Sequence, residues 1–352
     1  MKIKIISLMI VVLICMGTPA VVFAEQNKTV TITDLIGRTV DIPETVHHVA
    51  ALSGPGPEKV FLLGGIDKLA LVPPFYKGNS WATKIIPGIK NIPSDSIDDP
   101  SIEGLLNQSI DVVLFCDYPK PIEKMTDAGI PVVVTLATTP ETEPQSIDEF
   151  KDNFKKDISI YGDVLGPDAK AKAKKFNTYF DEKVNPILNI TSSIPENEKP
   201  KVYYVRGPDA LTTHGKNTNT AWLVSMAGGH LVSDQLQDMM PKVSIEQVIS
   251  WNPDIIVMGR VNSTSLIMDD PKWKDIKAVK EGKVYTNPDG VMSWDYSSEG
   301  VLLLEYLAKM FYPDKFSNID MIKEIKEFYS TFYNYSLTDD EADRILNHLS
   351  PA

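Results

Sequence analysis

Two arginines in the second half of the chain, Arg206 and Arg260, are well suited to bind a ligand. Each stands just past an aliphatic run that is typical of a buried strand. Two guanidinium groups at adjacent strand ends form a receptor for carboxylate, catecholate or oxyanion oxygens, because each group offers forked hydrogen-bond donors. The alternative is a surface arginine that pairs with a nearby acid such as Asp209.

Two further side chains carry groups that bind metal ions. His214 lies in a polar loop, and Tyr296 follows Trp294-Asp295 at another expected strand end. Imidazole and phenolate are suitable ligands for an open position on a chelated ferric ion. The alternative for both is a solvated loop residue. Cys116 ends a strand and is interpreted as a small buried hydrophobe.

Several aromatic residues in loops after strands could stack on a flat ligand, or could pack at the edge of a lobe. These are Tyr76, Trp81, Tyr118 and Trp294. The loop that begins at Ser53, with the sequence SGPGPE, is also expected to face the ligand. It lacks the Lys-Ser/Thr ending of a phosphate-binding loop.

The absent motifs favour a binding protein over an enzyme. The chain has five histidines and no His-rich loop, so capture of free zinc or manganese by a histidine and carboxylate cluster is not expected. It contains no H-E-x-x-H, no G-x-S-x-G and no P-loop. We therefore expect neither catalysis nor a resident cofactor.

The N-terminus has the features of a secretory signal peptide. Lys2 and Lys4 precede an apolar run that is followed by the small-residue pattern Val22-Phe23-Ala24, so we expect an exported protein cleaved after about Ala24. A lipid anchor on Cys15 is disfavoured because Ile14, which precedes it, is large. An uncleaved N-terminal tether is the other alternative.

The composition describes a folded, acidic protein. The chain has 352 residues, of which 43% are hydrophobic, and its formal net charge is −12. Removal of residues 1–24, which carry two lysines and no acid, changes that charge to −14. Such a surface repels nucleic acid and anionic lipid. Without the signal peptide, Cys116 is the single remaining cysteine, so no intramolecular disulfide can form.

The order of apolar runs predicts two similar α/β lobes with largely parallel sheets, because buried strands alternate with helical segments in each half. The first lobe covers residues 25–145, with strands expected at HVAAL, LALVP, DVVLFC and IPVVVTL. The second covers residues 200–312, with strands expected at KVYYVRG, HLVSD, DIIVMGR and KVYTNP. Residues 313–352 are expected to form C-terminal helices.

The segment 146–199 carries no strand signal and is expected to link the lobes through one long, rigid helix. Its apolar residues fall at positions 169, 173, 176, 180, 184 and 187, which define one helix face. Pro186 is expected to bend or end the helix near Asn185.

One short sequence occurs in both lobes. SIEGLLNQSIDVVL starts at Ser101 and SIEQVISWNPDIIV starts at Ser244. Each serine is a suitable helix N-cap, and Glu103 and Glu246 complement the helix dipole in the first turn. Their duplication also places two anionic groups at equivalent positions on the two lobes.

Taken in order, these segments resemble the substrate-binding proteins of ABC importers, in the helix-linked class that serves ferric siderophores, cobalamin and haem. The resemblance rests on DLIGRTVDIPETVHHVAAL, on the two Ser-Ile-Glu segments, on KWKDIKAVKEGKVYTNP and on SSEGVLLLEYLAKMFYP. It implies two lobes with a ligand cleft between them. It also implies that Glu103 and Glu246 dock onto basic sites of the two membrane subunits.

The resemblance implies a monomer that captures a metal chelate and delivers it to the importer, with a ferric siderophore favoured. Cobalamin or haem is the second possibility, and a molybdate or tungstate oxyanion is the third. An enzyme or metallochaperone on the same scaffold is the alternative of another class, since fold alone does not determine function.

Overall fold

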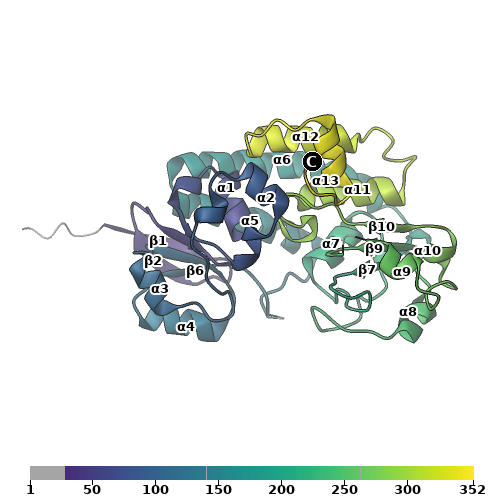
Figure 1. Cartoon of the computed structure of the whole chain (residues 1–352), viewed down its shortest axis with the longest axis horizontal. Coiled ribbons are helices and arrows are strands. Elements are labelled where there is room, and N and C mark those ends of the chain that lie inside the picture. The colour runs from purple at the N-terminus through teal and green to yellow at the C-terminus, as the bar shows by residue number, and fades with distance from the viewer. Residues whose placement is uncertain (1–27, 140, 262) are drawn as a thin grey trace, which may run out of the picture.

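A computed structural model describes residues 28–139, 141–261 and 263–352. The predicted signal peptide over residues 1–24 lies outside the described residues. Two lobes lie on either side of a central region, and helices run along one edge of the molecule across both (Figure 1). No helix in the described part of the chain is both long enough and apolar enough to cross a membrane.

The first lobe contains a four-stranded parallel sheet in the order β4-β3-β5-β6. All four strands fall on the predicted apolar runs: β3 Val49–Ala51, β4 Leu69–Leu71, β5 Val112–Cys116 and β6 Val132–Leu136. The helices around this sheet are α1 Gly56–Leu62, α2 Ser80–Ile85, α3 Ile102–Asn107 and α4 Pro119–Asp127. An antiparallel hairpin, β1 Thr29–Thr33 with β2 Thr39–Pro43, precedes them.

The second lobe repeats this arrangement with the strand order β10-β9-β7-β8, again parallel. Its strands are β7 Lys201–Val205, β8 His230–Leu231, β9 Ile255–Met258 and β10 Val284–Thr286. Its helices are α7 Asn219–Met226, α8 Ile245–Trp251, α9 Ser265–Met268 and α10 Lys277–Lys280. The predicted two-lobed α/β fold is therefore confirmed.

The duplicated segment forms the same local structure in each lobe. The hydroxyl groups of Ser101 and Ser244 cap α3 and α8, and each accepts a backbone N–H three residues on. The carboxylate of Asp111 accepts two backbone N–H groups just before β3, at 2.7 and 2.9 Å. The carboxylate of Asp254 accepts the N–H of the first residue of β7, at 2.8 Å. Each aspartate thus joins the amino ends of two neighbouring strands in its own sheet. In the second lobe, this edge of the sheet is the one opposite the strand ends that carry Arg206 and Arg260.

The link between the lobes differs from the single helix predicted for residues 146–199. It consists of two packed helices, α5 Ile147–Leu165 and α6 Pro167–Thr191, which meet at Gly166 with φ 107°. The predicted apolar face of α6 is buried. Pro186, which was predicted to bend or end the helix near Asn185, does not end it, because α6 continues to Thr191. Pro186 lies on the exposed side of α6, where water can bind the carbonyl that loses its N–H partner.

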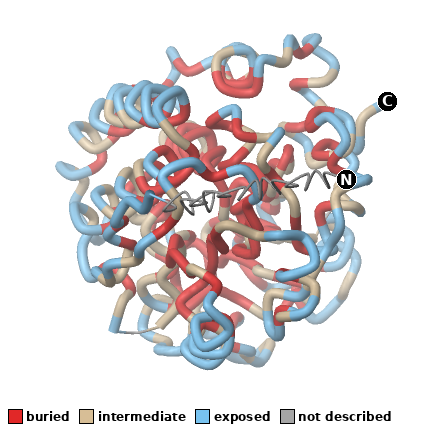
Figure 2. Tube along the Cα trace, turned by 90° about the vertical axis from the view of Figure 1, so that its left-hand side faces the viewer, coloured by how far each residue is buried: buried red, intermediate tan, exposed pale blue. Residues whose placement is uncertain are grey.

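The C-terminal helices form a second connection between the lobes. They are α11 Gly300–Phe311, α12 Met321–Phe332 and α13 Asp339–Leu346. Although they follow the second lobe, they contact the first: the indole N–H of Trp81 donates to the Leu349 carbonyl at 2.9 Å, and Lys84 pairs with Glu341 at 2.7 Å. One hydrophobic core continues from the first sheet through these helices into the second sheet. Figure 2, which looks along the long axis of the molecule, shows the buried residues gathered in the interior with exposed residues around them. Both connections oppose large hinge motion.

Candidate ligand-binding cavity

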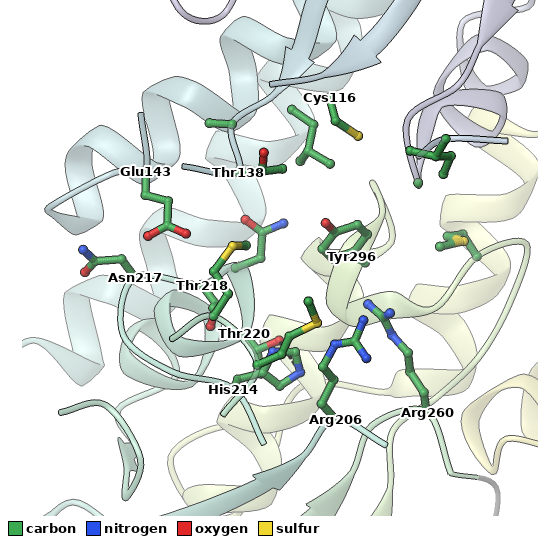
Figure 3. A pocket seen from close by; sticks show the side chains of 18 of the residues that line it. Cys116, Thr138, Glu143, Arg206, His214, Asn217, Thr218, Thr220, Arg260 and Tyr296 are labelled. Carbon is green, nitrogen blue, oxygen red and sulfur yellow. Dashed lines mark hydrogen bonds between the residues drawn. The ribbon is translucent and has the colours of Figure 1, made fainter. Parts of the chain in front are cut away.

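A cavity of about 350 Å³ lies between the lobes and is lined by side chains from both. From the first lobe come loops that follow β5 and β6, and from the second come loops that follow β7 and β9. The carboxyl ends of parallel strands are where open α/β sheets bind ligands. Figure 3 shows these side chains from the two lobes converging on one space.

Arg206 and Arg260 line this cavity side by side. Arg206 follows the end of β7 and Arg260 lies two residues past the end of β9, and these two strands are paired in parallel. Both guanidinium groups therefore leave the sheet at the same edge. Burial, and then the charge of Arg260, lower the pKa of Arg206. The two cations repel each other unless an anion lies between them.

A buried carboxylate stands behind this pair. Asp295 is fully buried, and its Oδ2 lies 3.9 Å from Nε of Arg260 and 3.6 Å from Nε2 of His214. Burial opposes ionisation of Asp295, but the charge of Arg260 and the contact with His214 outweigh it and hold its pKa below the ordinary value. Asp295 was not singled out from the sequence, where the signal available was its place between two aromatic residues in a strand-end loop.

His214 lines the cavity, but its surroundings favour a neutral ring. Burial lowers the pKa of His214, and the nearby Asp295 only partly offsets this effect. Its Nε2 also lies 3.3 Å from the hydroxyl of Thr220. With His214 neutral, the two arginines and Asp295 carry a net charge of +1 on this wall of the cavity, and the carboxyl group of Glu143 belongs to the lining as well.

Tyr296 and Tyr118 line the cavity as predicted from their loops. The guanidinium carbon of Arg260 lies 5.0 Å from the centre of the Tyr296 ring, a cation–π contact that holds the arginine in place. Burial raises the pKa of Tyr296, so the phenol keeps its proton at neutral pH. The described residues contain no group of three or more His, Cys, Asp or Glu placed to hold a metal ion.

Small polar groups complete the lining, and sequence reasoning did not single them out. Thr138 follows β6, and Thr218 and Thr220 stand at the start of α7, where the Thr218 hydroxyl accepts the Ala221 N–H at 3.2 Å. Cys116 also lines the cavity, and burial raises the pKa of its thiol to about 12. Other lining side chains are Phe75, Glu143, Asn217, Asn219, Met239, Met240 and Met292.

Four residues predicted to face the ligand are instead buried away from the cavity. Tyr76 and Trp294 are fully buried in the core that joins the lobes, and Trp81 is buried by the C-terminal segment. Ser53 is fully buried, with its hydroxyl 3.0 Å from that of Tyr161. In each case the segment lies near the cavity as predicted, but the named side chain packs into the interior. A neighbouring side chain, such as Phe75 or Tyr296, lines the cavity instead.

Glu103 and Glu246 do not line the cavity. They lie exposed in the first turns of α3 and α8. These two helices lie in different lobes, at the side of the molecule opposite α6 and α12 (Figure 1).

Comparisons with known proteins agree with this architecture. The model of the family described as "Periplasmic binding protein" matches residues 49–290. The chain is 26% identical over 333 residues to the molybdate-binding protein MolA of Haemophilus influenzae, which covers 89% of this chain and 93% of MolA. The structure of MolA with bound molybdate superposes with a TM-score of 0.80, at 24% identity over 88% of this chain and 99% of MolA.

Two further proteins are similar to this chain. A periplasmic solute-binding protein of Veillonella parvula is 27% identical, with a TM-score of 0.76, over 91% of this chain and 97% of its own. The Fe(3+)-citrate-binding protein YfmC of Bacillus subtilis is 25% identical over 240 residues, which are 62% of this chain and 71% of YfmC. The chain therefore belongs to the periplasmic binding protein family.

Proposed function

We propose that the chain captures a tetrahedral oxyanion of the molybdate and tungstate class between its lobes and delivers it to the membrane subunits of an importer. The observation that carries this proposal is the pair of guanidinium groups at the ends of β7 and β9. No ion pair of Arg206 occurs among the described residues, so its charge is left for the ligand. Arg260 is held by Asp295 and Tyr296.

The pair of arginines suits a dianion. Arg206 and Arg260 each offer several N–H donors, whereas the single hydroxyl protons of Thr138 and Thr218 already go to the backbone carbonyls of Asp117 and Gly215. A tetrahedral oxyanion accepts hydrogen bonds in all directions, so both guanidinium groups can bind it at once. The name of MolA supports the same ligand class.

An anionic ferric chelate is the second candidate and includes the ferric siderophores that the sequence favoured. Two observations favour it: the cavity of about 350 Å³ is larger than one oxyanion fills, and Phe75, Tyr118 and Tyr296 offer ring surfaces. The name of YfmC points to ferric citrate, a compact member of this class. Cobalamin and haem are the least favoured, because 350 Å³ lies near the lower end of small-molecule sites.

The remaining parts of the proposal come from the sequence. We propose an exported, monomeric binding protein without catalytic activity, cleaved after about Ala24. Docking through Glu103 and Glu246, one on each lobe, would present the ligand to two membrane subunits.

Isothermal titration calorimetry with a ligand panel tests the ligand class. The panel contains molybdate, tungstate, sulfate, phosphate, ferric citrate, ferric catecholate and hydroxamate siderophores, cobalamin and haemin. Molybdate or tungstate binding that exceeds sulfate and phosphate binding supports the proposal. Binding of a ferric chelate alone overturns it in favour of the second candidate. Mass spectrometry of the recovered ligand checks that it is unchanged, and a converted ligand would contradict a pure binding role.

A further inference from the structure

The duplicated helices carry a second exposed feature besides the glutamates. Leu106 in α3 and Ile249 in α8 are large aliphatic side chains, yet 57% and 43% of their surfaces are exposed. Each stands three residues after the glutamate of its own helix, Glu103 or Glu246. Residues three apart on a helix share a face, so each glutamate lies next to an exposed aliphatic side chain.

Packing inside the lobes does not explain why an aliphatic residue is exposed at the same position of both helices. The residue that precedes each aliphatic side chain, Leu105 or Val248, is fully buried and provides the contact of the helix with its lobe. Leu106 and Ile249, one position further along each helix, are left exposed at the surface. Single exposed aliphatic residues are ordinary on protein surfaces. What distinguishes these two is their occurrence at the same position of a repeated segment in both lobes.

We propose that Leu106 and Ile249 form, with Glu103 and Glu246, a pair of matching two-part contacts for the importer. Each contact combines one carboxylate with one aliphatic side chain. The partner that fits is a pair of membrane subunits that each present a basic site bordered by an apolar surface. This inference rests on the proposed docking role of the two glutamates, and it adds the aliphatic half of the contact.

Charge and position support this partner. Neither Glu103 nor Glu246 forms an ion pair among the described residues, so both carboxylates are free to meet a cation. The two helices lie in different lobes on the same side of the molecule (Figure 1). A partner with two equivalent subunits can therefore engage both contacts at once. Simultaneous engagement makes the second contact effectively intramolecular, which raises the overall affinity.

The test measures binding of this protein to its importer, reconstituted in nanodiscs of phosphatidylethanolamine and phosphatidylglycerol. The variants are L106S/I249S, E103A/E246A and the control L349S. Leu349 is 48% exposed and lies just after α13, a helix that Figure 1 shows on the side of the molecule opposite α3 and α8. Binding is measured by surface plasmon resonance without ligand and with molybdate present, and molybdate affinity is measured separately by calorimetry.

We expect L106S/I249S to weaken association with the importer about tenfold or more, since the serines remove the apolar surface that each contact would bury. L349S and the molybdate affinity of every variant should stay unchanged. In 0.5 M NaCl, the effect of E103A/E246A should shrink because salt screens charges, whereas that of L106S/I249S should persist.

Wild-type association of L106S/I249S, alongside weakened association of E103A/E246A, would overturn this inference and leave glutamate docking intact. Wild-type association of both double variants would overturn both. Neither result depends on the identity of the ligand, because association is also measured in its absence.

Discussion

Oδ2 of the fully buried Asp295 lies 3.9 Å from Nε of Arg260, directly behind the cavity. The same oxygen lies 3.6 Å from His214. One carboxylate thus offsets the charge of one arginine and holds it against the Tyr296 ring, while Arg206 has no such partner. The site combines one fixed cation with one that is free to respond to a ligand.

Replacement of the free arginine should remove affinity without harming the fold. We expect R206A to weaken molybdate binding about 10- to 100-fold, because a hydrogen bond to a charged group contributes about 1.5–3 kcal/mol. R206K should recover only part of the loss, since an ammonium group lacks the planar fork. Calorimetry measures both. R344A, outside the cavity, is the control, and unchanged affinity in R206A would contradict the assignment of Arg206.

Replacement of the fixed arginine should also cost stability. R260A leaves Asp295 buried without its main cationic neighbour, so we expect the melting temperature of R260A to fall clearly below that of R206A. Differential scanning calorimetry at pH 7 compares the two variants. Equal melting temperatures would show that Asp295 does not depend on Arg260.

The ionisation of Asp295 predicts a pH dependence. Its folded-state pKa is depressed, so the stability it contributes is present above its unfolded pKa, about 3.9, and is lost as pH falls toward the folded value. D295N should therefore be less stable than the wild type at pH 7, and the difference should shrink below about pH 4. Thermal unfolding between pH 3 and 8 measures this, and a difference that does not vary with pH would refute it.

Glu305 in α11 predicts the opposite pH dependence. Burial raises its pKa to about 8, although Lys183 of α6 lies 3.7 Å away. A carboxyl group whose pKa is raised in the folded state contributes stability at pH values below its unfolded-state pKa. That contribution is lost as the pH rises through the folded-state pKa. Wild-type stability should therefore fall between pH 5 and about 8, and E305Q should flatten this fall. Chemical unfolding at several pH values provides the measurement, with E123Q on the exposed side of α4 as the control, since Glu123 is not among the charges that shift Glu305.

The docking proposal predicts a separation of transport from binding. E103A/E246A should abolish ligand uptake by cells that carry the importer, while calorimetry shows unchanged ligand affinity, because both side chains lie outside the cavity. D111N, which alters the same repeated segment at its other end, is the control for an indirect effect on the lobe. Reduced ligand affinity in E103A/E246A would contradict docking as the role of these residues.

The sequence by itself determined the strands of the two parallel sheets, the two lobes and the positions of the two arginines, but not the hairpin of β1 and β2. A buried strand is recognisable from a few consecutive aliphatic residues, and a residue that follows such a strand must emerge at the carboxyl edge of the sheet. Arg206 and Arg260 could therefore be placed beside the cavity from local patterns. The serine caps of α3 and α8 are equally local, because a capping hydroxyl bonds within three residues.

Only the tertiary structure decided which side chain of each loop faces the ligand. Trp81 is turned inward by a hydrogen bond to the carbonyl of Leu349, 268 positions away. Asp295 depends on Arg260 and His214, which come from different strand-end loops. Such choices follow from the burial of apolar surface by segments far apart in the chain. The pattern of neighbouring residues within one loop cannot encode them.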